Sequence, residues 1–230
     1  MKQYKYLYFD LDRTLWDFEK NSQITLSEIY YNFKLNEHFS SFDVFFKTYH
    51  RINEKLWDLY RDGKIKKEQL RNDRFLLTLK TVDLKDKKLS VKIGDYYINE
   101  SPLKTELFPH TLEILEYLKS KNYKLLILTN GFKEVQTKKL NNCKIDKYFD
   151  KLICSEDIGY QKPRPEVFHY ALSSMNAKKT ESIMIGDDLK NDVYGAHNYG
   201  IDSVFFNPKQ KNAEYPLYQI FSLLELKNIL

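Results

Sequence analysis

The sequence has little cysteine and no apolar run long enough to cross a membrane. Its two cysteines, Cys143 and Cys154, belong to no CxxC pair and to no cluster of metal-ligating residues, so we expect free thiols in a reducing compartment. No apolar segment approaches the ~18 residues of a membrane span. The first residues lack the long apolar region of a signal peptide. We therefore expect a cytoplasmic protein with no membrane partner.

The sequence also lacks internal repeats, low-complexity linkers and a continuous basic segment. Its 230 residues are 42% hydrophobic and 30% charged, which predicts a packed globular body of one domain, or of one domain with a sizeable insertion. The formal net charge is +5, which suits an anionic ligand. Acids or apolar residues interrupt the lysine-rich stretches, so these indicate solvated helix faces rather than a nucleic-acid surface. We expect a small anionic ligand.

Short apolar runs that end at polar or acidic residues predict buried strands of a sheet. Helical patterns with apolar residues three and four positions apart separate these runs in the second half of the chain, and Gly200 is placed to end the last helix. This alternation predicts βαβ units and a mainly parallel sheet. The strands are expected at 6–9, 124–129, 181–185 and 203–206, with a weaker candidate at 151–154, and the helices at 109–121, 166–175 and 189–199.

The region from about Trp16 to Glu106 breaks this rhythm, with long helical patterns and no clear strand. Helices are expected at about 22–31, 42–60 and 67–79. An insertion directly after an acid-bearing strand suggests a cap over a site. We predict two domains, an α/β core of residues 1–15 and 107–230 and a helical cap of residues 16–106.

Polar side chains follow several predicted strands at the point where each strand ends. Ligands of open α/β sheets bind at the carboxyl ends of the strands, so these side chains are expected to converge. Carboxylates gathered in one place repel each other, and a divalent cation with hard oxygen ligands, Mg²⁺ above all, relieves this. Without it, a carboxylate and a phosphate at ~4 Å oppose each other by ~4 kcal/mol at an effective dielectric of 20. The residues concerned are Asp10, Asp12, Thr129, Asn130, Asp187, Asp188 and Asp192, with Lys162 in a loop before a helix.

Four short segments resemble, in order, the four motifs of the haloacid dehalogenase (HAD) superfamily. Residues 10–14, Asp-Leu-Asp-Arg-Thr, resemble its DxDxT motif, and Thr129-Asn130-Gly131 resembles the second. Lys162-Pro163 resembles the third, and the acidic segment 186–192 resembles the fourth. With the helical insertion, the resemblance covers nearly the whole chain. It implies a HAD-like Rossmannoid core with a helical (C1-type) cap, and a Mg²⁺-dependent phosphohydrolase.

The resemblance also implies a role for each motif residue. Asp10 would be the nucleophile that forms an aspartyl-phosphate. Asp12 would be the general acid and then the general base, with its backbone carbonyl on the metal. The remaining roles are metal binding by Asp10 and Asp187, orientation of the metal shell by Asp188 and Asp192, phosphate binding by Thr129, Asn130 and Lys162, and support of the first loop by Thr14.

Some of these residues have a structural alternative. Asp188 could cap the following helix, and Asn130-Gly131 could be a turn pair. Arg13 departs from the residue expected inside the first motif; it could point away from the metal or touch the phosphate or the cap.

The substrate is predicted from finer features. The dehalogenase branch lacks the second acid, so Asp12 favours phosphoryl transfer to water. Residues 15–22, with Thr129 to Phe132, resemble the YjjG-type pyrimidine 5′-nucleotidases. Trp16 and Phe18 could stack on a base or pack a hinge.

Three hypotheses remain open. The first is a nucleoside 5′-monophosphate phosphatase, acting as a monomer or a homodimer. The second is a phosphatase for sugar phosphates or phosphoglycolate. The third, from another class, is a non-catalytic phosphate-binding protein.

Overall fold

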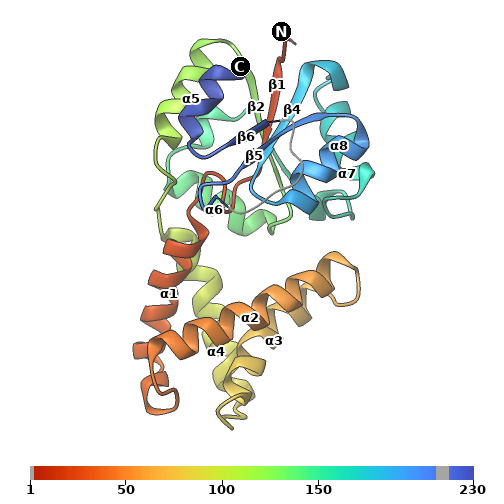
Figure 1. The fold of residues 1–230 in the computed structure, drawn as a ribbon. Helices are drawn as coiled ribbons and strands as arrows, with labels where there is room; N and C mark the ends of the chain where they lie inside the picture. Colours follow the sequence, from red (N-terminus) through yellow and green to blue (C-terminus); the bar gives the residue numbers. More distant parts are fainter. Residues whose placement is uncertain (1–2, 211–217) are drawn as a thin grey trace. The chain divides into compact units, whose positions relative to one another are not determined.

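The computed structural model describes residues 3–210 and 218–230, and the chain divides into two compact units (Figure 1). One unit contains Met1–Phe18 and Thr105–Leu230, and the other contains Glu19–Lys104. The described residues include no helix with the length and apolar character that a membrane crossing requires. Each unit has its own buried cluster of apolar side chains, so each is described by itself.

The first unit is built on a parallel sheet of six strands. The strand order β3-β2-β1-β4-β5-β6 puts β1 in the middle, paired with β2 on one side and β4 on the other. After β1 the chain adds β2 and β3 on one side of this strand, and it then adds β4, β5 and β6 on the other side. The strand order therefore reverses at β1, and α/β proteins bind ligands at such a topological switch point. The strands are β1 (Tyr6–Phe9), β2 (Lys124–Thr129), β3 (Lys151–Cys154), β4 (Ser182–Gly186), β5 (Asp202–Phe206) and β6 (Tyr218–Ile220).

Both faces of this sheet are covered, as the nearly continuous apolar character of its strands predicts. Along β1, Leu7 and Phe9 enter one core cluster and Tyr8 enters the other, because successive strand residues point to opposite faces. Helices α5 (Thr111–Ser120) and α6 (Lys133–Asn142) contribute to the first cluster. Helices α7 (Pro165–Ser173) and α8 (Gly195–Tyr199) contribute to the second. The unit is a three-layer sandwich.

The second unit is a helical body without strands among its described residues. Its helices are α1 (Phe18–Asn32, whose first residue belongs to the other unit), α2 (Phe42–Arg61), α3 (Lys67–Lys80) and α4 (Lys87–Glu100). Aromatic side chains fill much of its core; Tyr49 and Phe75, for example, stack with ring centroids 4.9 Å apart. Gly63 follows α2 with a φ of 71°, a left-handed conformation that glycine adopts without strain.

The predicted fold class is confirmed: a parallel α/β core with a helical insertion after the first strand. All five predicted strands are present, and Gly200 follows α8 with a left-handed φ of 91°. The expected helix at 189–199 is a π-helix (Leu189–Tyr194) followed by α8. Helices α4 and α6 and strand β6 were not predicted.

The packing of α5 predicts a large difference between two leucines on one helix. Leu115 is fully buried in the core and Leu112 is 48% exposed. Leu115→Ala should lower the free energy of unfolding by about 2–5 kcal/mol because it leaves a cavity, whereas Leu112→Ala should change it by less than about 0.5 kcal/mol. Urea denaturation of both variants measures this, and equal effects would contradict the packing described.

Candidate active site

Asp10 stands at the carboxyl end of β1, between the ends of β2 and β4. Its backbone N–H donates to the Ile185 carbonyl at 2.9 Å, which continues the ladder between β1 and β4 by one residue. The residue is only 8% exposed. The central strand therefore delivers a fixed carboxylate to the ligand-binding edge of the sheet.

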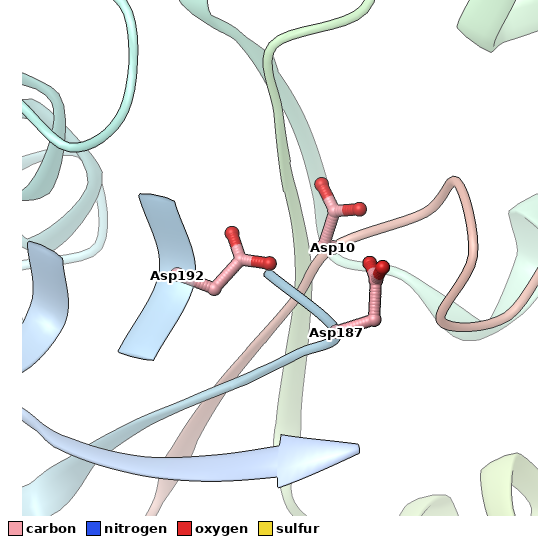
Figure 2. A group of neighbouring side chains, drawn as sticks. All are labelled: Asp10, Asp187 and Asp192. Atoms are coloured by element: carbon pink, nitrogen blue, oxygen red, sulfur yellow. The ribbon is translucent and has the colours of Figure 1, made fainter. Parts of the chain in front are cut away.

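Two further carboxylates meet Asp10 at this edge, both from the segment after β4 (Figure 2). Each of Asp10, Asp187 and Asp192 offers an oxygen, and these oxygens lie within 4.8 Å of one another. Asp192 is 1% exposed. A β-carbon on Gly186 would collide with the Asp192 carboxylate, so only glycine lets the chain turn back over the end of β4.

The Lys162 side chain joins two of these acids. Its Nζ atom donates to Oδ1 of Asp10, to Oδ1 of Asp192 and to the carbonyl of Leu128, each at 2.7 Å. All three hydrogens of the ammonium group have an acceptor, and the side chain is 2% exposed. Buried charges are tolerated when they are paired and hydrogen-bonded in this way.

Asn130 holds the loop that carries Lys162. Its Oδ1 accepts from the Lys162 backbone N–H at 2.8 Å and from the Ser155 hydroxyl at 2.6 Å, and its Nδ2 donates to the Lys162 carbonyl at 3.0 Å. The side chain of Asn130 thus helps to place Lys162, and phosphate binding by Asn130 stays a prediction.

Burial dominates the proton affinities of the acids. It raises the pKa of Asp10 and of Asp192, although the cation of Lys162 opposes the rise at both. For Asp187, burial and then the neighbouring charges of Asp10 and Asp192 raise the pKa well above its usual range. Burial alone would lower the pKa of Lys162, but its attraction to Asp10 and Asp192 outweighs burial and raises it.

These four groups fit a divalent cation. When all three acids are ionised, the ammonium group of Lys162 balances one of their three negative charges and leaves two. The pKa values of the acids are raised because binding a proton would also relieve the repulsion between the carboxylates. Mg²⁺ binds oxygen ligands at about 2.0–2.1 Å, and the three carboxylate oxygens, all within 4.8 Å of one another, are close enough to share one such ion. Asp10, Asp187 and Asp192 are the side chains that could hold such an ion. Asp192, predicted to orient the metal shell directly or through water, supplies one of the three clustered carboxylates.

Asp188 lies next to this cluster and caps the following π-helix. Its Oδ1 accepts from the backbone N–H groups of Lys190 and Asn191 at 2.9 and 3.0 Å, and its Oδ2 accepts from the Asn191 amide at 2.5 Å. The capping alternative thus accounts for its position. Thr14, fully buried, donates to Oδ1 of Asp187 at 3.4 Å.

Asp12 has partners that the motifs did not predict. Its Oδ1 accepts from Nζ of Lys139 at 2.5 Å, and its Oδ2 accepts from Nε2 of Gln136 at 2.7 Å. Nε2 of Gln136 also donates to the Thr129 hydroxyl at 3.0 Å. The sequence offered one signal for these two partners: Gln136 and Lys139 are polar residues three positions apart in one segment. The structure shows that both side chains are buried.

The aromatic pair after the first motif packs within its own unit. Trp16 is fully buried in the core cluster, and its ring meets that of Phe18 edge-on at 6.2 Å. The Arg13 guanidinium lies over the Phe18 ring, 4.2 Å from its centroid. Packing therefore accounts for Trp16, and stacking on a base stays a prediction.

Known proteins are similar to this chain over nearly its whole length. Residues 7–206 match the haloacid dehalogenase-like hydrolase family. Pyrimidine 5′-nucleotidase YjjG of Escherichia coli is 28% identical over 99% of this chain and 98% of its own. A glyceraldehyde 3-phosphate phosphatase of Pyrococcus furiosus is 29% identical over 100% and 93%.

A solved structure is similar over its whole length. The magnesium-bound HAD-hydrolase YfnB of Bacillus subtilis is 28% identical, with a TM-score of 0.90 over 100% of this chain and 99% of that one. The chain thus belongs to the haloacid dehalogenase-like hydrolase family, which confirms the superfamily assignment made from the motifs.

The pKa of Asp187 leads to a prediction about stability. Its folded-state pKa is raised, so between the unfolded value of about 4 and the folded value the folded state binds more protons. The free energy of unfolding of the metal-free protein therefore falls as pH rises through this window. Asp187→Asn removes the partly buried charge, so its metal-free form should melt above wild type at pH 7.5.

Thermal unfolding by circular dichroism in EDTA, from pH 4 to pH 8, measures this difference. Each kcal/mol corresponds to about 2–4 °C in Tm for a chain of this size. The gap between the two proteins should close as the pH falls toward 4. A lower Tm for Asp187→Asn at pH 7.5 would show that the carboxylate is stabilised without a cation.

Proposed function

We propose that this protein is a magnesium-dependent phosphomonoesterase that works through an aspartyl-phosphate on Asp10. The observation that carries the proposal is the buried arrangement at the end of β1. There the lysine-paired carboxylate of Asp10 lies beside two acids that can hold a cation. When bound, Mg²⁺ would neutralise charge on the phosphate and on Asp10, so that the two anions can approach.

In the first step, an Asp10 oxygen forms a bond to phosphorus and the bond to the ester oxygen breaks. Lys162 fixes Oδ1 of Asp10, which leaves Oδ2 as the attacking atom. Asp12 gives its proton to the departing alcohol oxygen. In the second step, Asp12 takes a proton from water, whose oxygen attacks phosphorus and releases Asp10 and inorganic phosphate.

The substrate we propose is a nucleoside 5′-monophosphate, with a pyrimidine base. Two observations support it: the likeness of residues 15–22 and 129–132 to the nucleotidase subfamily, and the similarity to YjjG over nearly the whole chain. The relative from Pyrococcus furiosus supports the second candidate, a sugar phosphate, at nearly the same identity. A cytoplasmic location fits both substrates.

Turnover of a substrate panel decides between the two candidates. Uridine and thymidine 5′-monophosphates, glyceraldehyde 3-phosphate and phosphoglycolate are assayed for phosphate release with Mg²⁺ or with EDTA. The nucleotides should have the highest kcat/KM, and EDTA should abolish turnover. A preference for glyceraldehyde 3-phosphate would favour the sugar-phosphate function. No Mg²⁺-dependent release from any ester would favour a binding protein.

Asp10→Asn tests the covalent step. The variant should lose at least about 10³-fold in kcat, because the attacking oxygen is replaced and binding alone remains. Rapid-quench mass spectrometry of wild type should find a phosphoryl adduct on the peptide that contains Asp10. Asp146→Asn, an exposed aspartate of the same unit, is the matched control and should keep wild-type kinetics. Near-normal turnover of Asp10→Asn would remove Asp10 from its role.

A further inference from the structure

Helix α6 carries two buried polar side chains on one face. Gln136 is 1% exposed and Lys139 is 4% exposed, although the other lysines of this helix are exposed. Residues three apart on a helix lie on the same side, so the two side chains reach in together. Both end on the Asp12 carboxylate, one on each oxygen.

The Lys139 ammonium has two interactions in its buried position. It pairs with Asp12, and it lies 4.0 Å from the centroid of the Trp16 ring, within range of a cation–π contact. Removing an ammonium group from water costs several kcal/mol even after relaxation. Apolar residues often replace a buried ion pair with no loss of stability. Core stability alone therefore gives little reason for a lysine at this position.

Gln136 extends the contact to a second loop. Its Nε2 group has two hydrogens; one goes to Asp12 and the other to the Thr129 hydroxyl, which also accepts from the Gly131 N–H at 3.0 Å. A β-carbon on Gly131 would collide with the Gln136 side chain, so this glycine makes room for the amide. One side chain thus joins the Asp12 loop to the loop after β2.

We propose that Gln136 and Lys139 are positioning residues that aim the acid–base carboxylate of Asp12 and couple it to the Thr129 loop. This inference rests on the phosphomonoesterase function proposed above. A carboxylate has about four lone-pair sites, and the clamp formed by Gln136 and Lys139 uses one on each oxygen. The sites left over carry the proton that passes to the ester oxygen and later arrives from water.

The clamp acts on proton transfer, so its loss should depend on the leaving group. Phenyl phosphate releases a weakly acidic phenol that needs a proton, whereas 2,4-dinitrophenyl phosphate releases a stable anion that needs none. The ratio kcat/KM reports steps up to the departure of the leaving group. It therefore isolates the acid step from the later hydrolysis of the aspartyl-phosphate.

Lys139→Met and Gln136→Leu provide the test. For each variant, kcat/KM for phenyl phosphate should fall by about 10²-fold, the lower range of general acid catalysis, while kcat/KM for 2,4-dinitrophenyl phosphate should stay within about threefold of wild type. The hydrolysis step also needs Asp12. Both variants should therefore show a burst of dinitrophenolate and accumulate phosphoenzyme.

Two further variants act as controls. Lys138→Met changes an exposed lysine of the same helix and should match wild type on both esters. Lys139→Arg keeps a cationic donor and should recover much of the activity toward phenyl phosphate. If Lys139→Met does not fold, as judged by circular dichroism, Gln136→Leu and Lys139→Arg decide the question.

The outcomes separate this inference from the function on which it rests. Equal losses on both esters, or no loss on either, would overturn the positioning role while wild type still forms the phosphoenzyme. Absence of Mg²⁺-dependent turnover and of phosphoenzyme in wild type would instead overturn the proposed function.

Discussion

The arrangement at the sheet edge depends on one buried ammonium group. The ammonium group of Lys162 lies between Asp10 and Asp192, and it donates a third hydrogen bond to the Leu128 carbonyl. Without this cation the three clustered carboxylates would carry three uncompensated charges. With it, the cluster keeps two excess negative charges, which one divalent ion can balance. Asn130 holds the backbone of the residue that supplies this ammonium group.

Asp10 and Asp12 are two residues apart, yet the structure gives each its own lysine. Lys162 reaches Asp10 from the loop before α7, and Lys139 reaches Asp12 from α6, on opposite faces of the sheet. Sites that run acid and base chemistry with similar groups depend on such differences in environment. The separation suits a pair in which one acid attacks and the other moves protons.

Sequence patterns predicted the sheet, the insertion and the motif residues because strand ends carry short, ordered signals. They missed α4 because its buried face is small and Gly94 interrupts it, although Asp86 caps its start. They missed Gln136 and Lys139 for another reason. Inside a helix rich in lysine, nothing in the one-dimensional pattern distinguishes the lysine that is buried from those that are solvated; only the placement of α6 against the first loop does so.

The amide at position 136 also limits which mutations this chain can tolerate. A glutamate would have the same shape, but it would turn a carboxylate toward the acceptors Asp12 and Thr129. A methionine would fill the volume but would remove one donor from Asp12, which keeps Lys139, and one from the Thr129 hydroxyl, which keeps the Gly131 N–H. Position 136 belongs to none of the four motifs, yet few other side chains could make both of its hydrogen bonds. A sequence profile built only on those motifs would therefore omit a residue that contacts the site.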